Sequence, residues 1–166
     1  MHFLLLIIAF FSIACSKPSS PITWDKCSQK LLDHPCDFTL IDQNGEPWNL
    51  YAHYGTPILL DFSTEWCYWC GVAALEVAEL APKYNFIYVT IMLENRTGKP
   101  ATQSLARSWA NDFNLTSPVL VGNTEMNYPI DGLPSFFMID DKMVLIGAMQ
   151  GLNTSALEAM IKRTQK

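Results

Sequence analysis

The sequence predicts an α/β fold in which helices cover both faces of a mixed central β-sheet. Apolar runs typical of buried strands alternate with segments of helical periodicity, as in residues 58–62 followed by 71–81. Two further segments, 37–50 and 136–148, have the turn chemistry of antiparallel hairpins. The chain has 166 residues and is 49% hydrophobic, which is sufficient for one domain with its own core.

The expected elements follow one another along the chain without internal repeats. Asn44-Gly45 supplies the positive φ that a tight hairpin requires, so the strands on either side of it should pair. Thr154 or Ser155 can cap a final helix, because a hydroxyl there accepts a backbone N–H of the first turn. The complete set is a short helix at 24–32, strands at 37–42, 47–50 and 58–62, a helix from 70 to about 82, a strand at 86–93, a helix at 101–113, strands at 119–121, 136–140 and 143–148, and a helix ending at about 163.

The N-terminal residues indicate an export signal and not a part of the fold. Residues 3–14 form an almost unbroken apolar run, shorter than the about 20 residues that a membrane-spanning helix needs. Ser12-Ile13-Ala14 places small residues where an export peptidase cleaves. A buried N-terminal strand is the alternative. The expected division is a signal peptide at 1–14, a tether rich in Ser and Pro at 15–22, and one folded domain at 23–166.

The junction at Cys15 resembles a bacterial lipoprotein signal, in which the cysteine becomes the lipidated N-terminus. The chain has five cysteines, and an unpaired thiol in an exported protein is a liability. Lipidation of Cys15 leaves four cysteines, enough for two pairs. Simple secretion is the alternative. The net charge of −5 and the scattered Lys and Arg residues argue against a nucleic acid partner.

The stretch Trp66-Cys67-Tyr68-Trp69-Cys70 carries the chemistry that the sequence indicates. It follows a predicted strand and opens a predicted helix, so Cys67 should lie at a helix N-terminus. The free N–H groups and partial positive charge of that terminus stabilise a thiolate, the form that attacks disulfides. Asp61, Glu65 and Glu76 are acidic neighbours that oppose this stabilisation. We therefore expect a pair that acts as a reductase more readily than as an oxidant.

The Cys-x-x-Cys spacing also occurs in half of a zinc site, which is the main alternative for this motif. Cys27, Cys36 and the nearby His34 would then have to supply the remaining ligands. The strand–turn–helix context favours redox chemistry instead, so we expect neither a metal nor another cofactor. Cys27 and Cys36 are then expected to form a structural disulfide. A second redox pair that relays electrons to Cys67 and Cys70 is the alternative.

The chain resembles the thioredoxin superfamily and, more narrowly, the exported TlpA-like or redoxin-like thiol–disulfide oxidoreductases. The resemblance implies a three-layer thioredoxin-like fold with an N-terminal β-hairpin and one inserted helix at 101–113. Leu75 stands where the family usually has proline, and Tyr68-Trp69 stands where a thioredoxin has Gly-Pro. The redox potential and the partner are therefore not given by the resemblance. The matching stretches are 35–40 with the turn at 44–45, 57–62, 65–70 and 132–140.

The resemblance also implies a role for each matching residue. Cys67 would be the attacking sulfur, Cys70 the buried resolving sulfur, and Asp61 the group that exchanges a proton with Cys70. Pro134 would be a cis-proline facing the pair. At least one aromatic side chain of the motif, most readily Tyr68, should be exposed for partner docking. The expected substrate-binding residues are Trp66, Tyr68, Leu133 and Pro134.

The expected partners are exported proteins that carry disulfides, with apocytochromes among the candidates by resemblance. A dithiol protein of the membrane or periplasm would be the electron donor. The expected location is the bacterial periplasm or the outer cell surface, with a lipid anchor holding the domain to the membrane. The alternative function is a thioredoxin-fold module that delivers a metal or binds a client without catalytic turnover.

Overall fold

The computed structural model describes residues 22–123 and 126–165. The expected signal peptide, the lipidation site at Cys15 and all of the tether except Ile22 lie outside the described residues. No helix in the described ranges has the length and apolar character needed to cross a membrane.

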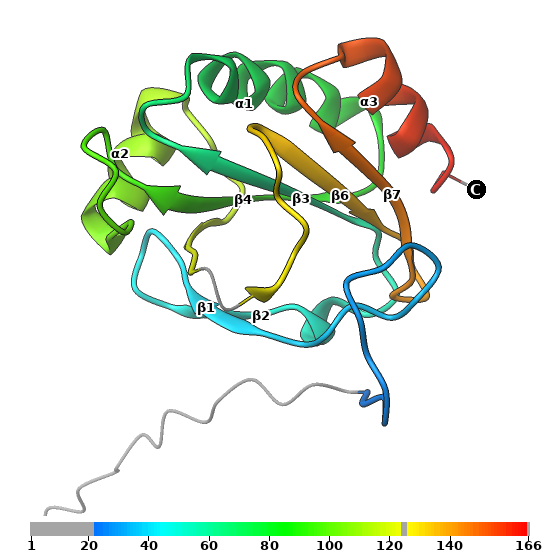
Figure 1. Ribbon diagram of the computed structural model, residues 1–166. Helices are drawn as coiled ribbons and strands as arrows, with labels where there is room; N and C mark the ends of the chain where they lie inside the picture. The colour runs from blue at the N-terminus through cyan, green and yellow to red at the C-terminus, as the bar shows by residue number, and fades with distance from the viewer. Residues whose placement is uncertain (1–21, 124–125, 166) are drawn as a thin grey trace, which may run out of the picture.

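A five-stranded mixed sheet, in the order β5-β4-β3-β6-β7, forms the centre of the molecule (Figure 1). Its middle strand, β3, pairs in parallel with β4 and antiparallel with β6. A separate two-stranded antiparallel sheet contains β1 and β2. The elements are β1 (Thr39–Ile41), β2 (Pro47–Asn49), the 3-10 helix η1 (Tyr51–His53), β3 (Ile58–Thr64), α1 (Tyr68–Leu80), the 3-10 helix η2 (Ala81–Lys83), β4 (Ile87–Glu94), α2 (Gln103–Asp112), β5 (Val119–Val121), β6 (Ser135–Ile139), β7 (Leu145–Gln150) and α3 (Thr154–Lys162).

Two apolar clusters cover the two faces of this sheet, because side chains alternate between faces along each strand. The first lies under the α-helices and includes Leu59 of β3, Cys70 of α1 and Leu157 of α3. The second includes Phe62 of β3 and Leu40 of β1, and it fills the space between the sheet and the β1–β2 hairpin. Every residue of β3 is buried, as expected for a central strand with both faces covered.

The α/β class, the mixed sheet and the N-terminal hairpin confirm the sequence prediction. The prediction that helices cover both faces is correct for the face under the α-helices, whereas among the described residues no α-helix covers the second face. All three α-helices contribute to the first cluster, whereas the second face is covered by β1, β2, η1 and residues such as Met126 and Tyr128. Figure 1 shows α1 and α3 above the sheet and β1–β2 below it. The described residues between β5 and β6 form no α-helix, and this stretch contains Pro129, Gly132 and Pro134, which interrupt helices.

The short helix predicted at 24–32 is absent, and turns and bends occupy this stretch. A disulfide between Cys27 and Cys36 closes the segment into a loop, which a straight helix could not accommodate. The loop packs along the β6–β7 hairpin: Leu32 N–H donates to Leu145 O at 2.8 Å, and Leu145 N–H donates to Asp33 O at 3.0 Å. Tertiary contacts and the cross-link therefore override the local helical pattern.

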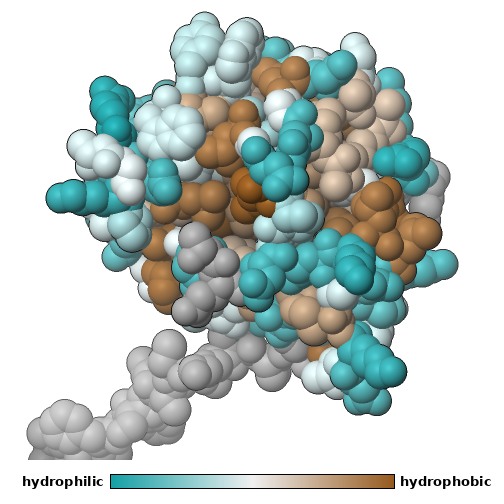
Figure 2. Space-filling view, viewed as in Figure 1, coloured by the Kyte–Doolittle hydropathy of each residue, from teal (hydrophilic) through white to brown (hydrophobic). Residues whose placement is uncertain are grey.

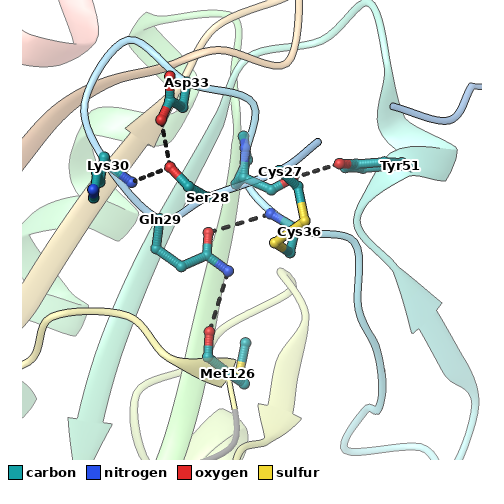
Figure 3. The surroundings of a disulfide bond; sticks show 9 residues. Cys27, Ser28, Gln29, Lys30, Asp33, Cys36, Tyr51 and Met126 are labelled. Carbon is teal, nitrogen blue, oxygen red and sulfur yellow. Dashed lines mark hydrogen bonds between the residues drawn. A yellow bond between two sulfur atoms is a disulfide. The ribbon is translucent and has the colours of Figure 1, made fainter. Parts of the chain in front are cut away.

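The loop around the Cys27–Cys36 disulfide is held by side chains on both sides (Figure 3). Gln29 Oε1 accepts from Cys36 N–H at 3.3 Å, and Gln29 Nε2 donates to Met126 O at 3.2 Å. The Tyr51 hydroxyl donates to Pro35 O at 2.5 Å. These hydrogen bonds join the loop that the disulfide closes to η1 and to the segment that follows β5.

One predicted helix cap is also corrected. The N-cap of α3 is Asn153, whose Oδ1 accepts from Ala156 N–H at 3.0 Å, and not Thr154 or Ser155. Asparagine is as good an N-cap as serine, so sequence alone could not separate these neighbours.

Candidate active site

Cys67 and Cys70 lie at the start of α1 and form a disulfide. Cys67 is the N-cap residue and is partly exposed, whereas Cys70 is fully buried in the first apolar cluster. The N–H of Cys70 donates to Cys67 Sγ at 3.1 Å. A backbone donor at a helix N-terminus would also stabilise negative charge on Cys67 after reduction. An incoming thiol or disulfide therefore has access to Cys67 before Cys70.

Asp61 lies in the middle of β3, on the sheet face that packs against α1. Its side chain is completely buried, and it accepts from the Tyr88 hydroxyl at 2.6 Å and from the Ser63 hydroxyl at 3.0 Å. Burial raises the pKa of Asp61 to about 7, and the two hydroxyl hydrogen bonds act against this rise. A carboxyl group with this pKa exchanges protons readily at neutral pH. By strand alternation Asp61 shares its sheet face with Leu59, which belongs to the same buried cluster as Cys70.

Pro134 lies at the same edge of the sheet, and the bond between Leu133 and Pro134 is cis. The antiparallel register pairs Ser135 with Phe62, so Pro134 falls beside the end of β3 that leads to Cys67. Leu133 is partly exposed and packs against the cluster that contains Cys70. The structure thus brings the predicted residues of β3, α1 and the loop before β6 to one edge of the sheet.

Three aromatic side chains surround the cysteines on the outside of the protein. Trp66, Tyr68 and Trp69 have exposed fractions of 52%, 76% and 60%. All three are therefore accessible, where the sequence required only one. Tyr68 and Trp69 contact each other edge to face at 5.3 Å, and Trp66 Nε1 donates to Glu94 Oε2 at 2.9 Å. The surface in the view of Figure 2 is mixed, with apolar patches among polar side chains.

A groove of about 400 Å³ runs from Cys67 between α1 and α2. Gly71 makes it possible for α2 to approach closely, because a Cβ at this position would lie 2.8 Å from the ring of Phe113. Apolar side chains of both helices line the groove together with Cys67. These side chains are Val72 and Leu75 of α1 and Leu105, Trp109 and Phe113 of α2 and its C-terminus.

Arg96 is a residue of this site that sequence reasoning missed. It lines the same groove as Cys67, although it is far from the motif in the chain. Its guanidinium lies 3.7 Å from Glu65, and its backbone N–H donates to Glu65 Oε2 at 2.8 Å. The strand–loop position of Arg96 gave no signal by itself, since only the pairing of β4 with β3 brings the two segments together.

The described residues contain no group of three or more His, Cys, Asp or Glu side chains that could hold a metal ion. Cys27 and Cys36 are bonded to each other, and Cys67 is bonded to Cys70, so the ligand set of the zinc alternative is not assembled. The two disulfides also lie on opposite faces of the sheet. Cys67 and Cys70 pack with the first cluster, whereas Cys36 lines a depression with Phe38, Leu40 and Met126 of the second.

Comparison with solved structures finds close agreement in fold. A thiol:disulfide interchange protein DsbE from Chlorobium tepidum superposes with a TM-score of 0.71 at 24% identity, covering 82% of this chain and 99% of that protein. The exposed lipoprotein thioredoxin Etrx1 from Streptococcus pneumoniae strain TIGR4 gives a TM-score of 0.65 at 21% identity, over 77% of this chain and 99% of its own. The chain has a thioredoxin-like fold.

Sequence comparison agrees with the thioredoxin-like fold at lower coverage. The thioredoxin-like protein YneN from Bacillus subtilis (strain 168) is 26% identical over 111 residues, which is 66% of this chain. The match covers 65% of that relative, just under two thirds of its length. No protein-family model matches the sequence. At these identities the comparisons establish the thioredoxin-like fold.

Proposed function

We propose that this chain is a thiol–disulfide oxidoreductase that acts on disulfides of exported proteins. One observation carries the proposal: a partly exposed Cys67 caps α1 and is bonded to a fully buried Cys70, and the sheet face that α1 covers carries the buried carboxyl of Asp61. One accessible sulfur and one protected sulfur are what a two-step exchange requires. The interchange protein and the lipoprotein thioredoxin that share the fold support the same activity and an extracytoplasmic location.

In the proposed reaction the reduced protein donates two electrons to a substrate disulfide. The Cys67 thiolate attacks one substrate sulfur, a mixed disulfide forms, and the other substrate sulfur leaves as a thiolate that takes up a proton. Asp61 then takes the proton of the Cys70 thiol, and the Cys70 thiolate attacks Cys67 Sγ. The Cys67–Cys70 bond forms, the mixed disulfide breaks, and the second substrate thiolate is released. A separate dithiol protein must reduce the pair again.

Two features support reduction as the working direction of the pair. The motif itself contains no cation, and Arg96, the cation among the described residues that line the groove, forms an ion pair with Glu65. The Cys67 thiolate therefore gains little charge stabilisation beyond the helix terminus, whereas strong oxidants have a well-stabilised thiolate. A measured reduction potential as oxidising as about −120 mV would contradict this direction. Export, the lipid anchor at Cys15 and apocytochrome substrates are parts of the same proposal.

Trapping with single-cysteine variants tests the order of attack. Cys70→Ser should accumulate mixed disulfides with substrate, because the resolving sulfur is missing. Cys67→Ser is the matched control and should accumulate none, since Cys70 is buried. The measurement is non-reducing electrophoresis with mass spectrometry of the adducts, beside an insulin-reduction assay and metal analysis of the unmodified protein. Equal trapping by both variants would refute the assignment, and bound metal without insulin reduction would favour the module that lacks turnover.

Replacement of Tyr68 tests whether the exposed aromatic side chains bind substrate. Tyr68→Ala should lower kcat/KM for a protein disulfide by roughly two- to tenfold, the usual range for the loss of one aromatic contact. The rate with a small disulfide that cannot reach beyond Cys67 should change much less. Tyr54→Ala is the control, because Tyr54 is also exposed but neighbours Trp24 on the other side of the sheet. A proportional loss with both substrates would show that Tyr68 does not contribute to docking.

A further inference from the structure

The carboxyl group of Asp61 is held without a positive charge. Within residues 22–123 and 126–165 no ion pair reaches it, and its two oxygens are occupied by different hydroxyls. The Tyr88 hydroxyl donates to Oδ2 at 2.6 Å, and the Ser63 hydroxyl donates to Oδ1 at 3.0 Å. Both donors are buried, so water does not compete with them.

The elements around Asp61 are β4, β6 and α1, and their side chains near its sheet face are as follows. On β4, Tyr88 and Thr90 share its face, and Thr90 is its direct register partner. On β6 the register partner is the apolar Phe136, and on α1 the cluster supplies Cys70 with apolar residues. The titratable group that contacts the carboxyl is therefore the Tyr88 hydroxyl, and Cys70 lies in the cluster on the same sheet face.

We propose that Tyr88 is a positioning residue of the exchange site, whose hydroxyl fixes the orientation of Asp61 and keeps it ionised so that it can take the proton of Cys70. This inference rests on the proposed function. A donor to a carboxylate favours the charged form, and the 2.6 Å contact is in the short range of charge-assisted hydrogen bonds. The Tyr88 hydrogen bond orients Oδ2 of Asp61 from β4, whereas Ser63, on the same strand as Asp61, orients Oδ1.

Tyr88 suits this role because it does not itself release its proton. Burial and the neighbouring Asp61 charge raise the pKa of Tyr88 well above its ordinary value, while the Thr90 hydroxyl opposes the rise. The phenol therefore stays a donor over the whole range in which Asp61 titrates. Proton transfer is left to Asp61 and Cys70, and Tyr88 determines the pH at which Asp61 accepts.

The test is Tyr88→Phe, which removes one hydroxyl and retains the ring in the core. The pKa of Asp61 should rise by about one to two units when a charged hydrogen bond is lost. Carbon-13 NMR of the aspartate carboxyl groups measures this titration without any substrate, with Asp61→Asn used to assign the signal. The pH profile of single-turnover insulin reduction should move to higher pH by the same amount, with a roughly fivefold or larger loss at pH 7.

Tyr84→Phe is the matched control, because the Tyr84 hydroxyl also donates to a carboxylate, that of Glu158, outside the site. It should change neither the Asp61 titration nor the pH profile. If Tyr88→Phe lowers the rate at every pH without moving the profile or the titration, Tyr88 is only a packing residue and the inference is overturned. If the unmodified protein reduces no disulfide, the proposed function fails, while the NMR titration still decides whether Tyr88 controls Asp61.

Discussion

Asp61→Asn is expected to stabilise the folded protein at and above neutral pH, although it slows disulfide exchange. The carboxyl is fully buried without a cation, and burial raises its pKa from 3.8 to about 7. Wherever the unfolded chain ionises this group, folding has either to protonate it or to bury its charge, and both cost free energy. Asparagine fills nearly the same volume, still accepts the Tyr88 hydrogen bond and carries no charge.

The pH dependence follows from the direction of this shift. Because the folded-state pKa is raised, the folded protein holds its proton more tightly than the unfolded chain. The stabilising contribution of protonated Asp61 is complete below about pH 4 and is lost as the pH rises through about 7. The difference between the variant and the unmodified protein should be small at pH 4 and grow to about 4 kcal/mol at pH 8.

Urea unfolding of the oxidised proteins between pH 4 and 8 measures this difference. Glu79→Gln provides the control for the loss of a carboxylate, since Glu79 lies on the exposed side of α1. If the free energies of unfolding of Asp61→Asn and of the unmodified protein differ by the same amount at every pH, the raised pKa of Asp61 is contradicted. In the same variant, insulin reduction at pH 7 should fall because no carboxylate remains to take the proton of Cys70, and an unchanged rate would remove Asp61 from the proposed mechanism.

The fold class could be predicted from sequence because its central elements carry strong local patterns. The apolar run that opens β3 and the cysteine-capped α1 were placed within a few residues of their observed bounds. The N-terminal loop was not, because its conformation depends on a cross-link and on hydrogen bonds to Leu145, which is remote in the chain. Local periodicity contains no information on either.

Some residues of the candidate site could be predicted from the sequence, and others could not. Cys67 and Cys70 are three positions apart in the sequence and could be assigned from spacing and context. Tyr88 and Arg96 come from β4 and the loop after it, and they join the site only because β4 pairs with β3 in one particular register. Inside an apolar strand a tyrosine normally reads as core, and no sequence feature distinguishes one whose hydroxyl is directed at a buried carboxylate.

Removal of the Cys27–Cys36 disulfide should destabilise the protein without abolishing its exchange activity. The cross-linked positions are separated by 9 residues, and closing a loop of this size stabilises the folded state by roughly 2–3 kcal/mol through the entropy of the unfolded chain. The double variant Cys27→Ser/Cys36→Ser avoids an unpaired thiol. Its unfolding free energy in urea should fall by this amount. Its insulin reduction should remain near normal, because the active pair lies on the opposite face of the sheet.

The alternative is a relay in which Cys27 and Cys36 pass electrons to Cys67 and Cys70. A relay pair would be reduced together with the active pair under mild reductant, whereas a structural disulfide stays oxidised, and mass spectrometry after thiol labelling separates the two cases. Ser28→Ala is the matched control, because it removes the Ser28–Asp33 hydrogen bond of the same loop and leaves the disulfide intact. If the double variant keeps its stability but loses turnover with a dithiol donor, the relay is correct. The sheet separates the two cysteine pairs, so their sulfurs are not in contact within one folded chain. This separation favours a structural disulfide over a relay.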